Sequence, residues 1–447
     1  MTKAPFRLAV AACAVAATLT ASPAFAQIPN IAIKIDGKID AADTAWMIAA
    51  TSLVLMMTIP GLALFYAGMV RKKNVLATMA QSMAATFLVS ILWAFIGYSL
   101  AFTGDGAYIG TLERIFLSGM TLDAISPLAK TIPESLFMLY QMTFAVITVA
   151  LVAGSVADRL RFSAFLLFCV FWLLLVYVPI AHWVWGGGFL GSYGVVDFAG
   201  GLVVHLNAGI AGLVAATMIG KRRGYGSENL SPHDLTLAVI GTGLLWVGWF
   251  GFNGGSALGA NSRAAMAIVS THLSASAGAF TWMALEWWIR GKPSVLGMIS
   301  GAVAGLGTIT PASGFVLPMQ AALIGLVAGA VCFWACTWLK LKIGYDDSLD
   351  VFGVHGVGGL TGTLLAGVLA VGALSASPEM PGGVSGLLEG NPQQVLAQAY
   401  GIVITLAWSG IVTFIVLKVV GTMVPLRVRH EDEVMGLDVT QHGEALQ

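Results

Sequence analysis

The chain has 447 residues, of which 57% are hydrophobic and only 10% are charged, with 22 basic and 22 acidic side chains. A soluble domain carries about 25% charged residues, so this composition excludes a soluble globular protein and indicates an integral membrane protein. The apolar segments run to about 20 residues, which predicts membrane helices rather than the short alternating strands of a barrel. A net charge of zero gives no reason to expect nucleic-acid binding.

The first 26 residues predict a signal peptide. MTKAPFR is a basic start, LAVAACAVAATL is an apolar stretch, and ASPAFA ends in the small-x-small pattern of a signal-peptidase site. The mature chain is expected to begin at Gln27, outside the membrane. The cysteines of the mature chain, Cys169, Cys332 and Cys336, all lie in apolar segments and are expected to be small packing residues. No metal and no cofactor is predicted.

Eleven membrane helices are predicted in residues 27–418, and they form one domain. Their approximate ranges are 45–68, 77–102, 135–157, 163–186, 199–220, 235–257, 264–288, 295–313, 318–339, 350–373 and 395–418. Of the 22 Lys and Arg residues, 15 follow the odd-numbered spans. By the positive-inside rule, the N-terminus lies outside and the C-terminus in the cytoplasm. Residues 419–447 form a short cytoplasmic tail, either disordered or regulatory.

A pattern of aspartate, histidine and two glycines occurs twice, 150 residues apart, on the fifth and tenth spans. The two copies are Asp197, His205, Gly209 and Gly212, and Asp347, His355, Gly359 and Gly362. Spans one to five and six to ten would then be two halves of five helices, followed by one C-terminal helix. Because five is odd, the halves must be inverted in the membrane. Inverted repeats are typical of transporters, which bind near the midplane where the repeats meet.

The spacing within each copy predicts that the two histidines meet. Each aspartate stands at the start of its helix, where a carboxylate caps free amides. Eight residues of helix place each histidine about 12 Å into the membrane from opposite faces of a core about 30 Å thick. We expect His205 and His355 to line one pathway, because ionisable groups inside a membrane are usually functional. The alternative is a structural pair whose rings satisfy each other.

Three residues of different spans are predicted near the outer mouth: Phe144, Trp185 and Ser256. Phe252 lies one helical turn deeper than Ser256. Aromatic faces attract cations and a hydroxyl accepts a hydrogen bond, so these side chains could bind a cation. On spacing alone, packing or interfacial anchoring is the commoner role of such aromatic residues.

Several long motifs resemble the ammonium transporter family (Amt/Mep/Rh), with the closest likeness to bacterial Amt proteins. They are TIPGLALFYAGMVRKKNVL, AHWVWGGG, DFAGG…VVHLNAGIAGL, GWFGFNGGSA, RGKPS and DVFGVHGVGG. Together they extend from the first span to the tail, so the resemblance covers essentially the whole mature chain.

The resemblance implies an eleven-helix protomer of a homotrimer in the bacterial inner membrane, with one pore per protomer. It implies an external ammonium site at Phe144, Trp185 and Ser256, a gate of stacked Phe144 and Phe252, and a pore lined by His205 and His355. It also implies that Asp197 is needed for transport. The family often has phenylalanine four residues before the gate phenylalanine. Here that residue is Tyr140, which is counted in the outer site and departs from the family pattern, because its hydroxyl can change affinity or hydrogen bonding there.

The resemblance also implies control by a PII-type signal protein that inserts a loop from the cytoplasm. The stretch GLDVTQHGE resembles the part of the family's tail that takes part in this control.

The function expected is transport of ammonium, with methylammonium as an analogue. Desolvating an isolated cation is very costly, so the ion would lose its proton near the gate and cross as ammonia. Two alternatives remain: a pore for another small neutral solute such as water or urea, and an ammonium sensor that scarcely conducts. No enzyme activity is expected, because the chain has no paired-histidine metal motif, nucleophile motif or cofactor loop.

Overall fold

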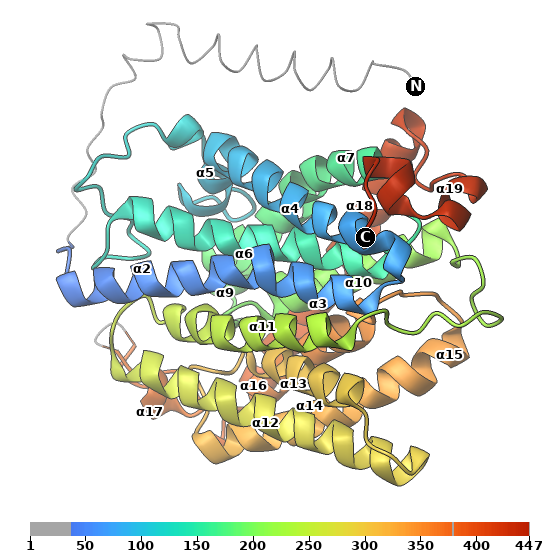
Figure 1. The fold of residues 1–447 in the computed structure, drawn as a ribbon. Coiled ribbons are helices and arrows are strands. Elements are labelled where there is room, and N and C mark those ends of the chain that lie inside the picture. The colour runs from blue at the N-terminus through green and yellow to red at the C-terminus, as the bar shows by residue number, and fades with distance from the viewer. Residues whose placement is uncertain (1–36, 378–379, 447) are drawn as a thin grey trace, which may run out of the picture.

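The computed structural model describes residues 37–377 and 380–446, and these are almost entirely helical. In that part of the chain, extended pairing is limited to two isolated bridges, Ser126 with Ala129 and Leu160 with Arg427. The long helices lie side by side, with loops at the two ends of the bundle (Figure 1). The predicted signal peptide, residues 1–26, lies outside the described residues.

Nine helical stretches in the described part of the chain are long and apolar enough to cross a membrane. In the first half they are α2–η2–α3 (Ala41–Met56, Met57–Leu62, Ala63–Met69), η3–α4–η4–α5 (Lys72–Asn74, Val75–Leu92, Trp93–Gly97, Tyr98–Phe102), α6 (Glu134–Ser155), α7–η6–α8–α9 (Phe162–Trp172, Leu173–Tyr177, Val178–Trp185, Phe189–Ser192) and η7–α10 (Gly201–Leu206, Asn207–Ile219). In the second half they are α11 (Leu235–Gly255), α14–η8–α15 (Pro318–Trp334, Ala335–Leu339, Lys340–Ile343), η9–α16 (Phe352–Gly356, Val357–Leu369) and α18 (Pro392–Met423). The predicted class, an all-α membrane protein, is confirmed.

Two further helices lie at the remaining predicted spans. α12 (Ser262–Arg290) is long but less apolar, and it buries Ser270, Thr271, Ser274 and Glu286 against its neighbours α13 and α14. α13 (Val295–Ile309) has 15 residues, which is about 22 Å of helix and shorter than the hydrocarbon core. The count of eleven spans therefore stays a prediction. The short helices elsewhere are η5 (Ile115–Leu117), α17 (Gly372–Ser375), η10 (Leu387–Glu389), α19 (His430–Met435) and η11 (Asp438–His442).

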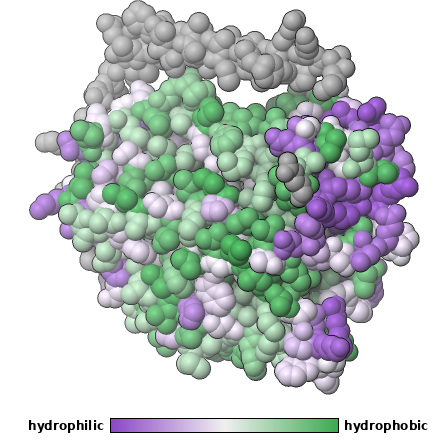
Figure 2. Space-filling view, viewed as in Figure 1, coloured by the Kyte–Doolittle hydropathy of each residue, from purple (hydrophilic) through white to green (hydrophobic). Residues whose placement is uncertain are grey.

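The surface of the bundle matches a membrane protein. Figure 2 shows hydrophobic residues over much of the flank and hydrophilic residues gathered at the end that carries α19. That end also holds α15 (Figure 1). The charged end is the one that the distribution of Lys and Arg predicts to face the cytoplasm.

Wide-turn helix occurs at matching places in the two halves. In η7 and η9 the histidines lie within the wide turns, and each of these segments leads into a helix of 13 residues, α10 or α16. The amide of His205 bonds to the carbonyl of Gly200, five residues back, at 2.9 Å. Such turns are rare and often mark functional sites. α10 packs on η9 and α16 packs on η7, so the two spans cross in opposite directions, as the predicted inversion requires.

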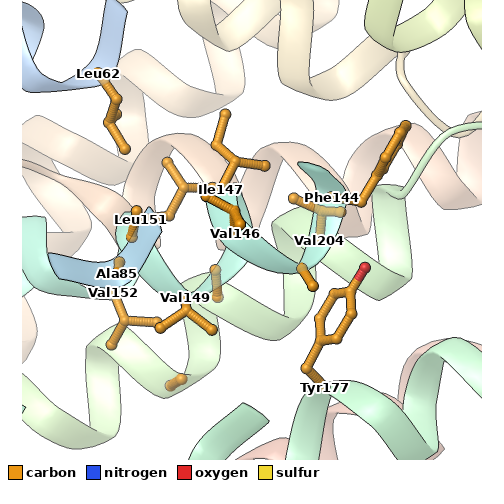
Figure 3. Close-up of a cluster of buried hydrophobic side chains, with 14 of the residues drawn as sticks. Leu62, Ala85, Phe144, Val146, Ile147, Val149, Leu151, Val152, Tyr177 and Val204 are labelled. Carbon is orange, nitrogen blue, oxygen red and sulfur yellow. The ribbon is translucent and has the colours of Figure 1, made fainter. Parts of the chain in front are cut away.

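The core of the bundle is built around α6, which is buried over 89% of its most apolar stretch. Its side chains Phe144, Ile147 and Leu151 lie among residues of other helices, including Leu62 and Val204 (Figure 3). A helix that is hydrophobic on all sides is expected to be surrounded by others. α6 thus lies at the centre of the bundle, surrounded by other helices.

The C-terminal tail is folded over residues 430–446, so the disordered alternative is wrong for this part. The amide of Leu437 donates to Oδ1 of Asn74 at 2.8 Å, and the amide of Ala77 donates to Oδ1 of Asp438 at 2.8 Å. These bonds dock α19 and η11 on the start of α4. The regulatory role of the tail stays a prediction.

Candidate functional site

Four aromatic side chains from three helices form one cluster. The rings of Phe144 and Phe252 are stacked, with centroids 4.2 Å apart and planes at 25°. Trp185 stands edge-on to Phe144 at 5.7 Å, and Tyr140 contacts Phe144 at 5.0 Å. Phe144 is 1% exposed and Phe252 is 0% exposed. The stacked pair is therefore buried within the cluster.

The side chains of Ser256 and Tyr140 contact carbonyl groups in the last turn of α11. The Tyr140 hydroxyl lies within hydrogen-bond distance of the carbonyls of Gly251 at 3.1 Å and Phe252 at 2.8 Å, and Ser256 Oγ donates to the Phe252 carbonyl at 2.8 Å. The final carbonyls of a helix lack partners within the helix, so these contacts fix its end. Tyr140 is 1% exposed. Its ring belongs to the cluster, but its hydroxyl is turned toward α11.

Asp197 caps the wide-turn segment η7. Its carboxylate accepts the amides of Gly200, Gly201, Leu202 and Val203 at distances between 2.6 and 3.1 Å. Free amides at a helix start and the positive end of its dipole both favour a carboxylate here. The backbone carbonyl of Asp197 also accepts the indole N–H of Trp185 at 2.8 Å. One residue thus holds both the start of the histidine-bearing segment and the aromatic cluster.

The two histidines predicted to meet are in contact. Nδ1 of His205 lies 3.2 Å from Nδ1 of His355, and the rings are nearly parallel, at 18°. Because a hydrogen bond needs one donor and one acceptor, one Nδ1 carries a proton and the other accepts it. Nε2 of His205 is buried without a partner in the described part of the chain. It is thus free to form a hydrogen bond with a small molecule in the cavity that His205 lines.

Glycines allow the histidine segments to approach. A Cβ on Gly209 would lie 2.2 Å from the Cα of Gly356, and a Cβ on Gly359 would lie 2.6 Å from the carbonyl of Gly201. Neither position tolerates a side chain without backbone movement. The glycine four residues after each histidine therefore has the packing role that the repeat predicts.

Sequence reasoning missed Trp249. Its ring stacks on His205, with centroids 5.4 Å apart and planes at 22°, and its indole N–H donates to Thr310 Oγ1 at 2.9 Å. Trp249 lies three residues before Phe252 on α11. Its presence in the motif GWFGFNGGSA could have placed it near the gate.

A small cavity lies between Phe252 and the two histidines. Its lining is formed by Met57, Leu62, Phe65, Ile147, Leu151, Val204, His205, Leu245, Trp249, Phe252, Val303 and His355. About 10 Å³ is open to the centre of a water-sized molecule, close to what one small molecule needs. Apart from the two imidazoles the lining is almost wholly apolar. The cavity suits a small neutral molecule that can hydrogen-bond to a ring nitrogen.

Comparison with known proteins identifies the chain. The model of the Ammonium Transporter Family matches residues 45–446. An ammonium transporter of Bacillus subtilis is 48% identical over 90% of this chain and 97% of its own length. The chain belongs to the ammonium transporter family. The crystal structure of Saccharomyces cerevisiae Mep2 superposes with a TM-score of 0.82 at 38% identity, covering 89% of this chain and 90% of that one.

Membership of the ammonium transporter family establishes a membrane-spanning transporter and ammonium as its cargo. A solved structure described as a sensor Amt protein also superposes, with a TM-score of 0.81 at 27% identity over 90% of this chain and 98% of that one. The fold by itself therefore does not separate transport from sensing. That distinction rests on the 48% identity to named transporters and on the cavity.

Proposed function

We propose that ammonium is recruited at the aromatic cluster, loses its proton near the gate, and crosses as ammonia past the two histidines. The observation that carries this proposal is the apolar cavity between Phe252 and the imidazole pair, which has room for about one small molecule. An unpaired cation in such a cavity is costly, whereas neutral ammonia is not. The free Nε2 of His205 supplies a hydrogen-bond partner along the way.

In the proposed outer site, Trp185, Phe144 and the ring of Tyr140 surround the cation and Ser256 accepts a hydrogen bond from it. Aromatic faces attract a cation through their quadrupole. Asp197 acts through position, because it holds both Trp185 and the start of η7. Phe144 and Phe252 form the gate, and their rings must separate to admit the substrate.

The proposal is tested by uptake of labelled methylammonium into proteoliposomes that contain the purified protein. We expect saturable uptake that ammonium inhibits, and its dependence on an imposed membrane potential reports whether the proton follows the ammonia. Water or urea permeation without methylammonium uptake would support the neutral-solute pore. Binding without uptake would support a sensor.

The membrane, the assembly and the orientation of the protein are also proposed. We place the chain in a bacterial inner membrane as a homotrimer with one pore per protomer, the N-terminus outside and the C-terminus in the cytoplasm. The charges at the end of the bundle that carries α19 support this orientation (Figure 2). Lipid surrounds the apolar flank of the trimer.

The docked tail supports control by a PII-type signal protein at the cytoplasmic face. Glu433 joins the tail to the loop after α10, because its carboxylate accepts the amide of Arg223 at 2.6 Å, and it pairs with Arg427 at 2.7 Å. Lys73 donates to the carbonyl of Val434 at 2.6 Å. A partner that binds the cytoplasmic end of the bundle could therefore contact the tail and displace it.

Deleting residues from Glu431 onward is expected to weaken inhibition by the PII-type protein of the same cell. The proposed pathway residues all precede α18, so methylammonium uptake without the partner should stay within about twofold of wild type. Uptake by inside-out vesicles, with and without that protein and with its nucleotide and 2-oxoglutarate state controlled, measures both effects. Undiminished inhibition of the truncated protein would show that the tail has no regulatory part.

A further inference from the structure

Asp347 is the counterpart of Asp197 in the repeat, but its carboxylate is held differently. Asp197 uses both oxygens to accept amides. In Asp347, Oδ2 accepts the amide of Phe352 at 2.7 Å, while Oδ1 is buried with no hydrogen-bond partner in the described part of the chain. The residue is 0% exposed. A buried oxygen left unpaired costs free energy, so its retention calls for a functional reason.

The nearest cation does not satisfy this oxygen. Nζ of Lys340 bonds to the backbone carbonyl of Asp347 at 2.6 Å and to Oδ1 of Asp350 at 2.6 Å. The side chain of Asp350 is 33% exposed, so it reaches the cytoplasmic solvent by the predicted topology. Lys340 and Asp350 therefore lie between the backbone of Asp347 and the solvent.

The other charged groups facing Asp347 are already engaged. Arg222 forms an ion pair with Asp346 at 2.7 Å. Arg159 donates to the carbonyls of Gly220 and Asp346 and to Ser348 Oγ. The neutral titratable groups around the carboxylate are Tyr66, Tyr345 and Cys336. With Lys340 and Asp350 the cluster holds three cations and three carboxylates, and only Asp347 has a fully buried, unpartnered oxygen.

The cluster lies directly behind the wall of the cavity. Tyr66 is the neighbour of the cavity-lining Phe65, and its hydroxyl donates to the carbonyl of Leu151, another lining residue, at 3.0 Å. The residue after Asp347, Ser348, bonds through its amide to the carbonyl of Ser155 at the end of α6 at 3.1 Å. Asp347 precedes His355 by eight residues. It thus stands between the histidine pair and the solvent.

Burial raises the pKa of Asp347 to about 6, with the charge of Asp350 adding to the rise and that of Lys340 opposing it. The carboxyl is therefore protonated below this value and mostly ionised at neutral pH. A group that titrates near the operating pH exchanges protons effectively in both directions.

We propose that Asp347 exchanges the proton of ammonium at the cytoplasmic end of the pathway. This inference rests on the proposed crossing as ammonia. In export, an N–H bond of ammonium breaks, its electron pair stays on the nitrogen, and the proton forms an O–H bond on Oδ1. The carboxyl then releases the proton to water near Asp350. In import the carboxyl returns a proton to the emerging ammonia.

The test compares Asp347→Asn with the wild type in proteoliposomes of known orientation. An amide can neither take nor return the proton, so efflux of labelled methylammonium at internal pH 7 and its influx should both fall about tenfold. Infrared difference spectra of the wild type should show a carboxyl C=O band that titrates near pH 6, and Asp347→Asn should lack it.

Asp350→Asn serves as a second variant that keeps the proton acceptor. Removing its charge should move the titration midpoint of that band to lower pH without abolishing it, because Asp350 raises the pKa of Asp347. Glu228→Gln, an exposed loop carboxylate on the same side, should leave band and fluxes unchanged. Wild-type efflux in Asp347→Asn would overturn the inference. So would an unchanged titration midpoint of the carboxyl band in Asp350→Asn. Absence of uptake by the wild type would instead overturn the proposed function.

Discussion

Replacing Asp197 with alanine is expected to lower methylammonium uptake by about 100-fold or more. The change leaves four backbone amides of η7 without their acceptor, and each buried unpaired group costs about 1–3 kcal/mol. It also removes a buried carboxyl group from the residue that contacts Trp185 of the proposed outer site. The start of η7 should shift, and with it both the Trp185 indole and His205. Initial uptake rates in proteoliposomes, normalised to the amount of folded protein, measure the effect.

Two variants frame the Asp197 result. Asp197→Glu keeps the charge but cannot hold all four amides at once, so it should retain part of the activity. Asp234 provides a matched control, because it caps α11 through the amides of Thr236 and Leu237 away from the pathway. Asp234→Ala should keep uptake within about twofold of wild type. Full activity in Asp197→Ala would refute its capping role in transport.

Replacing either histidine with alanine is expected to change the uptake rate, or the selectivity for ammonium over potassium, by about tenfold. The two rings share one contact, 3.2 Å between their Nδ1 atoms. Losing either ring leaves the other nitrogen unpaired and widens the cavity. The double variant His205→Ala/His355→Ala should therefore not show the sum of the single effects.

Flux of methylammonium and of a potassium tracer through the same proteoliposomes measures both quantities. His182 supplies the control, because its ring nitrogens contact the carbonyls of Ala101 in α5 and of Gly106 in the loop after it, away from the cavity. His182→Gln is expected to lower thermal stability and leave selectivity unchanged. Wild-type rate and selectivity in both single histidine variants would show that His205 and His355 do not line the pathway.

Much of the fold and the site follows from residue patterns alone. Apolar runs of membrane length locate helices because backbone groups must be satisfied within each span. The repeated spacing of Asp197 and His205, and of Asp347 and His355, locates the histidine pair because residue spacing along a helix sets depth. The side-chain chemistry of Phe144, Trp185 and Ser256 suggested the outer cluster, and the family resemblance gave it a role.

Other features were decided only by how the helices pack. The wide turns of η7 and η9 shift each histidine from its regular helical position. No residue type in the sequence predicts these turns. Trp249 of α11 stacks on His205 of η7. The Tyr140 hydroxyl turns to α11 because the last carbonyls of that helix need donors. Asp197 and Asp347 have identical spacing to their histidines, yet only one carboxylate is saturated. The sequence determines which groups enter the membrane, whereas the count of amides, charges and rings around each group depends on neighbours distant in the chain.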